Sequence, residues 1–223
     1  MVTGGSQSQY TGTFRLVATL SCVVALLCLN GRSIHAQNVS QPPHSTLVFY
    51  GDSHLQPDLW PALFSALQQD LVVREGAYAA AGILDPAPEM IRGTELQAGN
   101  IVHNVVIVHL IGRCDVLPQA AWAPSGKGPL GWVSDNHGQI APFIDINCSR
   151  IAQVLNARAL GMSQQDRRQA FCQAISHVLI HEWIHIATQS SSHAPKGIES
   201  AQLTPDELIA APPQPFSRSS GGR

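Results

Sequence analysis

Histidine is concentrated near the C-terminal end of this 223-residue sequence. Four of its histidines fall within seventeen residues: His177, His181, His185 and His193. Side chains four residues apart on a helix lie on the same side, one turn apart, so the rings of His181 and His185 could reach one Zn²⁺ at about 2.0–2.1 Å. Glu182 would be rotated by about 100° from His181, beside the metal, where a carboxylate can deprotonate a water molecule. The HEWIH run at 181–185 therefore predicts a helix that supplies two zinc ligands and a general base.

A catalytic zinc site needs a third protein ligand and keeps one position for water, whereas a structural site is closed by four protein ligands. His193 is the leading candidate, because it lies eight residues after His185, behind a run of three serines that lets the chain turn back. Glu199 and Glu207 are the alternatives, although Glu207 also fits an ordinary acidic residue in the first turn of a helix. His177, one turn before the HEWIH run, is interpreted as a packing or hydrogen-bonding residue. The expected cofactor is one Zn²⁺ ion.

Three segments have the apolar spacing of helices. The HEWIH run lies in a long helical pattern that begins at a cap formed by Ser163 and Asp166 and extends to about Gln189. A shorter helix is expected at Ser149–Leu160. The segment Asp58–Val73 carries apolar residues at helical spacing and predicts a further amphipathic helix.

Five segments are typical of strands. They are Ser45–Gly51, Gly76–Ile83, Ile101–Ile111, Gly131–Val133 and Ile140–Asn147. A polar turn joins the last two, and residues 117–127 are read as a loop that contains Pro and Gly. This order of strands and helices predicts an α+β or three-layer α/β domain that spans residues 37–210.

The first 36 residues have the order of a secretory signal peptide. A weakly basic leader precedes an apolar run from Leu16 to Leu29, and a polar stretch then ends in Ala36, an acceptable cleavage site. The run is short for a bilayer span, so we expect no membrane anchor after the signal is removed; an anchor left in place is the alternative. The sequence therefore predicts a secreted or periplasmic protein, with a Pro-, Ser- and Gly-rich disordered tail at 211–223.

Charge and cysteine content fit an exported domain. Removing residues 1–36 takes away two arginines and no acidic residue, so the formal net charge changes from −2 to −4 and offers no basic surface for nucleic acid or anionic lipid. Cys114, Cys148 and Cys172 remain, and an oxidising compartment permits one disulfide. Cys114 and Cys148 each follow a strand-like run, and parallel neighbouring strands would bring both to the same edge of the sheet. We therefore favour a Cys114–Cys148 disulfide and a buried Cys172.

The HEWIH helix, preceded by a short helix and a mostly strand-forming half, resembles the catalytic domain of the zincin metallopeptidases. The run HVLIHEWIHIATQSSSHAPKGI is similar, more narrowly, to a group of small, exported, largely uncharacterised bacterial zincin-like proteins. Their third histidine, the small residue after it and a later glycine correspond to His193, Ala194 and Gly197. The chain departs from the metzincin pattern of Gly at 188 and His at 191, where it has Thr188 and Ser191. The resemblance implies a zincin-like α+β fold: a mixed, mostly parallel sheet packed on the HEWIH helix and a further amphipathic helix.

The resemblance also implies a reaction, the hydrolysis of peptide bonds by a zinc-activated water. Glu182 would take the proton of this water and pass it to the leaving amine. The substrate would be a peptide or protein, and the strand at 131–133 would be either the sheet edge that pairs with it or an ordinary edge strand. The competing interpretation is a non-catalytic protein with a zincin fold. Such a protein would bind zinc without turnover and would serve as a binding or scaffolding module. A purely structural site has no need of a carboxylate beside its histidines, so Glu182 favours catalysis.

Overall fold

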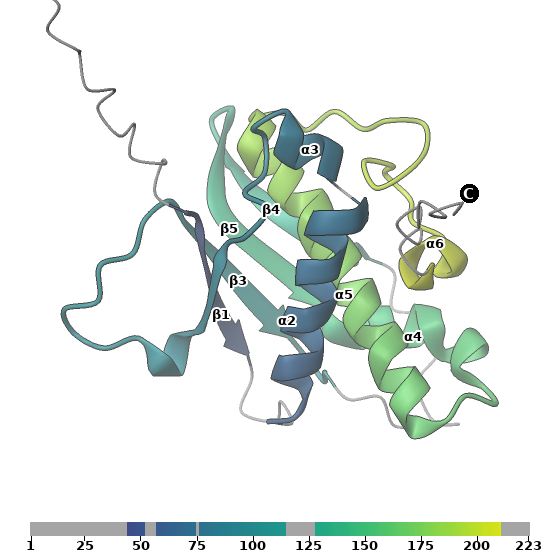
Figure 1. Cartoon of the computed structure of the whole chain (residues 1–223). Coiled ribbons are helices and arrows are strands. Elements are labelled where there is room, and N and C mark those ends of the chain that lie inside the picture. The colour runs from purple at the N-terminus through teal and green to yellow at the C-terminus, as the bar shows by residue number, and fades with distance from the viewer. Residues whose placement is uncertain (1–43, 52–56, 75, 115–127, 211–223) are drawn as a thin grey trace, which may run out of the picture. The chain divides into compact units, whose positions relative to one another are not determined.

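The computed structural model describes residues 44–51, 57–74, 76–114 and 128–210. The expected signal peptide at 1–36, the loop at 117–127 and the expected disordered tail at 211–223 lie outside the described residues. In the described part, helices pack on a five-stranded, mostly parallel sheet (Figure 1). This is an α+β architecture, one of the two that the order of the elements predicts.

The sheet contains four parallel strands and one antiparallel strand. The strands span Thr46–Gly51 (β1), Glu89–Arg92 (β2), Val105–Ile111 (β3), Gly131–Asn136 (β4) and Gln139–Asn147 (β5). Their order in the sheet is β2-β1-β3-β5-β4, so β2 and β4 form the edges. A tight turn with positive φ at His137 and Gly138 joins β4 to the antiparallel β5.

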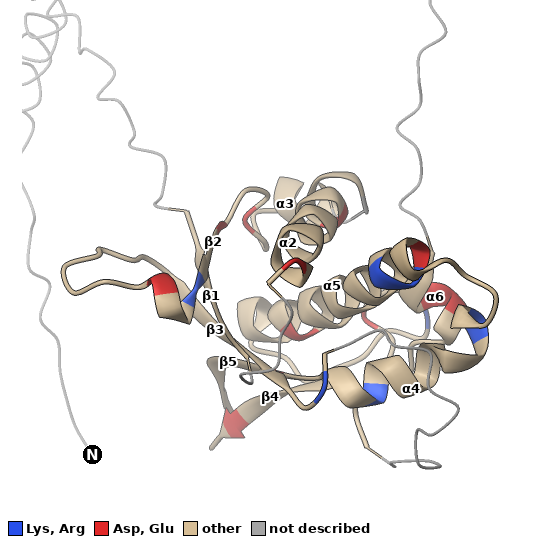
Figure 2. Cartoon of the chain, turned by 90° about the horizontal axis from the view of Figure 1, so that it is seen from below, with Lys and Arg blue, Asp and Glu red and all other residues tan. Residues whose placement is uncertain are grey.

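Side chains alternate between the two faces of a strand, and here one face forms the hydrophobic core. Val108 of β3 and Ile144 and Ile146 of β5 are at most 1% exposed. In β1, the ring of Phe49 contacts the ring of Phe64 from helix α2 (Leu59–Gln69), with centroids 5.1 Å apart. Figure 2 shows α2 and the long helix α5 (Gln164–Thr188) on the same side of the sheet. The core therefore lies between this face and the two helices.

The helices lie close to their predicted positions. Ser163 caps the long helix, and its side chain accepts a hydrogen bond from the Asp166 N–H at 3.1 Å. The helix predicted at Asp58–Val73 corresponds to α2 followed by a π-helical turn at Asp70–Arg74. The helices span Leu59–Gln69 (α2), Gly76–Ala80 (α3), Cys148–Ala159 (α4), Gln164–Thr188 (α5) and Pro205–Ile209 (α6).

Helix α5 is surrounded by the rest of the domain. Every residue from Phe171 to His185 is buried, because the helix contacts α2, α4, α6, β4 and β5. A buried polar side chain costs free energy unless it has a partner, so the polar residues within this stretch need one. They are Gln173, Ser176, His177, His181, Glu182 and His185.

The prediction of a strand at Gly76–Ile83 is wrong. Residues 76–80 form α3, after which the Ala81 N–H donates to Ala77 O and the chain turns at Gly82 with a φ of +70°. The segment contains four alanines, and alanine has the highest helix propensity and no branched Cβ to favour a strand. The fifth strand of the sheet is instead β2. Its short sequence, Glu-Met-Ile-Arg, shows no clear alternation of apolar and polar residues that would have predicted a strand.

The other strand predictions correspond to β1, β3, β4 and β5. The strand expected from Ile101 begins only at Val105, because Asn104 adopts a φ of 44°, outside the extended region. β4 continues to Asn136 and so extends beyond the expected Gly131–Val133.

The Sγ atoms of Cys114 and Cys148 are bonded to each other, which is the pairing that the sequence favours. Strands β3 and β5 are parallel neighbours, so the chain leaves both at the same edge of the sheet. The Cα atoms are 4.9 Å apart, within the usual range for a disulfide. Cys172 is buried, and burial raises the pKa of its thiol to about 12, so the thiol is protonated and unreactive at neutral pH.

Two ion pairs at the surface link helices. Arg168 of α5 pairs with Asp58 at 2.8 Å, and Arg158 of α4 pairs with Asp206 of α6 at 2.6 Å. Exposed pairs of this kind contribute at most about 1 kcal/mol each. No helix in the described residues combines the length and the apolar character that a membrane crossing requires.

Candidate metal centre

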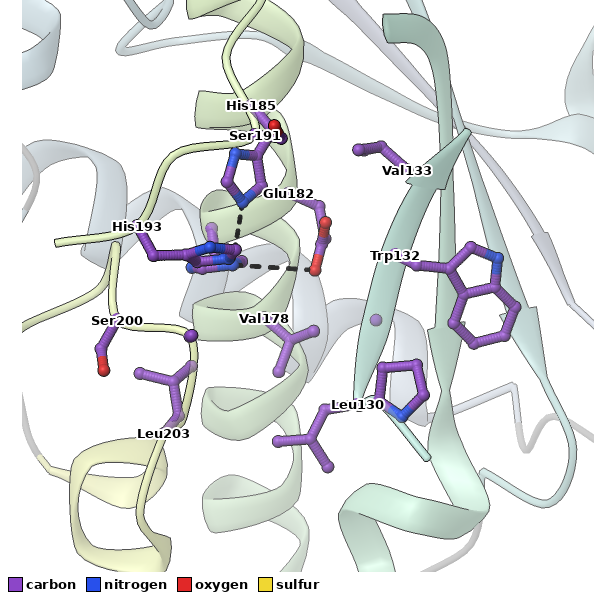
Figure 3. Close-up of a pocket in the computed structure, with 14 residues that line it drawn as sticks. Leu130, Trp132, Val133, Val178, Glu182, His185, Ser191, His193, Ser200 and Leu203 are labelled. Carbon is purple, nitrogen blue, oxygen red and sulfur yellow. Dashed lines mark hydrogen bonds and ion pairs between the residues drawn. The ribbon is translucent and has the colours of Figure 1, made fainter. Parts of the chain in front are cut away.

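Three imidazole rings converge where α5 meets the loop that follows it (Figure 3). His181 and His185 lie on α5, and their Nε2 atoms are 3.1 Å apart. His193 comes from the loop, and its ring centroid is 5.3 Å from that of His181 and 4.9 Å from that of His185. One nitrogen from each ring lies within 4.8 Å of the others. Among the described residues, these rings form the single group of three or more potential ligand side chains that could hold a metal ion.

Backbone carbonyls fix the protonation of two of these rings. Nδ1 of His181 lies at hydrogen-bond distance from Ile198 O, and Nδ1 of His185 is 2.6 Å from Ser190 O. A carbonyl oxygen can only accept, so each Nδ1 carries a proton, and the Nε2 of each neutral ring presents a lone pair. Two such lone pairs that face each other at 3.1 Å repel unless a metal ion or a proton lies between them. Metal-binding histidines have this arrangement, in which the second ring nitrogen donates to a carbonyl.

The spacing of the nitrogens fits a tetrahedral ion. Two nitrogens bound at about 2.0–2.1 Å with a tetrahedral angle between them lie about 3.3 Å apart. The Nε2 atoms of His181 and His185 are separated by 3.1 Å. The pKa of His181 is lowered, chiefly by burial, and this favours the neutral ring that binds a metal. His193 is exposed and can adjust its ring toward the other two.

Glu182 lies beside the rings rather than among them. Its Oε1 is 4.0 Å from Nε2 of His181, and Figure 3 shows its side chain between α5 and β4. The residue is 6% exposed, and burial raises the pKa of its carboxyl group to about 7. A carboxyl group with this pKa can both accept and return a proton near neutral pH, as a general acid–base must.

The raised pKa of Glu182 predicts how the stability of the metal-free protein depends on pH. Folding raises this pKa from 4.5 to about 7, so the folded state binds more protons and the free energy of unfolding falls as pH rises through this range. Glu182→Gln cannot ionise. At pH 8 the metal-free variant should therefore be more stable than the wild type by up to about 3 kcal/mol, with little difference at pH 4. Urea unfolding with a chelator present measures this, and a difference that does not change with pH would contradict the prediction.

A cavity of about 360 Å³ opens in front of the rings, between α5, β4 and the loop that follows His193. Leu130, Val178 and Leu203 line its apolar end (Figure 3). Gly131 lets β4 approach α5 closely, because an added Cβ would lie 2.5 Å from Cγ1 of Val178 and 3.2 Å from Cγ of Glu182. The cavity therefore exposes the rings and Glu182 to a molecule that lies along β4.

The two alternative third ligands lie outside this group. Glu207 closes the capping box of α6, where its carboxylate accepts from both the N–H and the Oγ1–H of Thr204 at 2.8 Å. Both hydrogen bonds lower the pKa of Glu207, and the bond from the backbone N–H of Thr204 has the larger effect. Glu199 is half-buried and lines a second cavity of about 290 Å³ that also borders the rings. His193 is the residue that the structure brings together with His181 and His185.

His177 belongs to a separate buried cluster. Its Nε2 is 3.1 Å from Nε2 of Gln173 and 3.4 Å from Oδ2 of Asp70. Gln173 also donates to Asp70 Oδ1 at 2.6 Å. This cluster joins α5 to the π-helical turn after α2, so His177 acts in packing, the role that the sequence analysis gave it.

Sequence reasoning missed the groups that orient the rings. The carbonyls of Ser190 and Ile198 belong to the backbone, and no side-chain motif marks them. The close approach of β4 to α5 at Gly131 depends on tertiary structure. The run of serines before His193 was the sequence signal that the loop turns back toward α5. The structure adds a left-handed residue in this loop, Gly197, whose φ is +81°.

Comparisons of this chain with protein-family models, with curated proteins and with solved structures found no match. Its function therefore has to be inferred from its own residues. The most informative of these are the three histidines and Glu182, because the histidines could hold a metal ion and Glu182 lies beside them.

Proposed function

We propose that this protein is an exported, zincin-like metallopeptidase in which His181, His185 and His193 hold one Zn²⁺ and Glu182 is the general base. One observation carries the proposal: two Nε2 atoms face each other at 3.1 Å while backbone carbonyls hold both Nδ1 atoms. The nearby carboxyl group of Glu182 and the adjoining cavity favour catalysis over a structural role.

The donor set fits zinc. Imidazole nitrogens suit Zn²⁺ and other transition metals, whereas Ca²⁺ and Mg²⁺ prefer oxygen ligands. Three protein ligands are also the usual number in catalytic zinc sites, and structural sites have four. When bound, zinc would act as a Lewis acid toward a substrate carbonyl and would lower the pKa of a water molecule toward 7.

Glu182 would carry the proton transfers. Its carboxyl group lies 4.0 Å from Nε2 of His181, within reach of a water molecule beside the rings. It would accept a proton from the attacking water and donate it to the amine that leaves when the peptide bond breaks. A buried carboxyl group whose pKa is about 7 is suited to both steps.

Strand β4 would hold the substrate. It is an edge strand, and residues 131–133 line the cavity. On the side away from β5, no strand among the described residues pairs with it. An extended peptide can form main-chain hydrogen bonds with such an edge. Because these bonds need an extended backbone, we propose peptides or unstructured protein segments as the substrates.

The purified protein should contain about one zinc ion per chain and should cleave an unfolded protein or a peptide library. Excess chelator should stop the cleavage, and added Zn²⁺ should restore it. Elemental analysis and mass spectrometry of the products measure the two properties. Zinc without cleavage would favour the alternative function, a non-catalytic zinc-binding scaffold. The absence of both zinc and cleavage would contradict the proposal.

A further inference from the structure

Gln189, the residue directly after α5, makes three hydrogen bonds with its side chain. Its Oε1 accepts from the Ile140 N–H at 3.0 Å, and its Nε2 donates to Ile140 O at 3.0 Å and to Ile186 O at 2.8 Å. The carboxamide thus pairs with the backbone of Ile140 as a neighbouring strand would. It joins the end of α5 to the beginning of β5.

The backbone of Gln189 ends α5. Its φ of 51° and ψ of 37° are left-handed, and its N–H donates to Ile186 O at 3.4 Å. The N–H of Ser190 donates to His185 O at 3.3 Å. These two bonds form a Schellman motif, in which glycine is usual because a Cβ is strained at positive φ. A glutamine here accepts that strain, and the three bonds of its carboxamide offset it.

The same turn orients one of the three rings. Ser190, which follows Gln189, bonds to His185 twice: through its N–H to the carbonyl and through its own carbonyl to ring Nδ1. The loop that begins at this turn also supplies His193 and the Ile198 carbonyl at the ring of His181. A shift of the turn would therefore move the Ser190 carbonyl, which accepts from the ring of His185, together with the ring of His193.

Gln189 also connects this loop to the opposite wall of the cavity. Its partner Ile140 lies in β5, opposite Asp135 of β4. The same strand continues to Val133, which lines the cavity across from the rings (Figure 3). One carboxamide thus links the loop on one side of the cavity to the β4–β5 hairpin on the other.

We infer that Gln189 is a positioning residue for the metal centre. By fixing the end of α5 against β5, it sets the loop so that His193 and the Ser190 carbonyl lie where the metal site needs them. This inference rests on the proposed zinc site and adds to it a residue that touches neither the metal nor the substrate. A residue that merely ended a helix would change the stability of the fold and leave the affinity for zinc unaltered.

Gln189→Gly tests the inference, because glycine keeps the left-handed turn and removes the carboxamide. The affinity of the metal-stripped protein for Zn²⁺, measured by competition with a chelating dye, should fall about 10- to 100-fold, as it does when groups that orient metal ligands are removed. Gln189→Glu keeps the acceptor toward Ile140 but replaces the NH₂ donor with a second acceptor. It should weaken Zn²⁺ binding to a similar extent.

Ile151→Val is the matched control. Ile151 is fully buried in α4 and lines neither cavity at the rings, so the variant should lower the stability of the fold and leave the Zn²⁺ affinity unchanged. Wild-type Zn²⁺ affinity in both Gln189 variants would overturn the positioning role and leave the zinc site intact. Failure of the wild type to bind Zn²⁺ would overturn the proposed function, and the positioning role with it.

Discussion

Zinc should be lost when His181 is replaced by alanine. The change removes one of the three proposed ligand nitrogens, Nε2 of His181, which lies 3.1 Å from Nε2 of His185. Removing a group that only orients a metal ligand lowers metal affinity by up to about 100-fold. Removing a ligand itself should therefore lower the affinity for Zn²⁺ by more than this. Elemental analysis of the purified variant should find close to no zinc, and titration of the metal-stripped protein with Zn²⁺ gives the change in affinity.

His177→Ala is the control for this prediction. It removes a buried histidine one turn earlier on the same helix, where the ring contacts Gln173 and Asp70. The variant should lose stability, because it removes a buried ring and one of the polar partners of Gln173 and Asp70, and should still bind zinc. Zinc content equal to that of the wild type in His181→Ala would remove this histidine from the site.

Glu182→Gln should keep the zinc and lose most of the peptide hydrolysis. Glutamine has nearly the same shape as glutamate but cannot accept the proton of the attacking water. General acid–base catalysis contributes about 10²- to 10⁴-fold, and kcat should fall by this factor. KM should change little, because the amide can occupy the same space beside β4. Steady-state kinetics with a peptide found by library screening measures both constants.

A matched control for this variant is Glu89→Gln, which makes the same chemical change at an exposed position on β2. It should leave kcat, KM and zinc content at wild-type values. Hydrolysis by Glu182→Gln at the wild-type rate would exclude this residue as the base. Loss of zinc from Glu182→Gln would instead show that the carboxyl group supports metal binding.

The sequence predicts the helix that carries the site well, because strong local signals agree there. The cap at Ser163 defines the start of α5, and the four-residue spacing of His181 and His185 places both rings on one side of the helix. His193 could be predicted as the third histidine of the group, because it lies only eight residues after His185 and the serines between them let the chain turn back. The Cys114–Cys148 disulfide was also foreseen, on the condition that the strands before the two cysteines are parallel neighbours, as β3 and β5 are.

The remaining parts of the structure depend on contacts that a single sequence does not display. The strand β2 is a short edge strand with little alternation, and α3 was mistaken for a strand because small apolar residues fit both structures. The helix was expected to end near Gln189, but nothing in the sequence shows that the side chain of Gln189 bonds to Ile140, which is distant in the sequence. Tertiary contacts of this kind override local propensity.

The most direct test of the account is anomalous X-ray diffraction at the zinc absorption edge from crystals grown with Zn²⁺. The account predicts one strong peak about 2.0–2.1 Å from Nε2 of both His181 and His185, with a ring nitrogen of His193 at a similar distance. A peak elsewhere on the molecule, or none at these three rings, would contradict the claim that they form a metal centre.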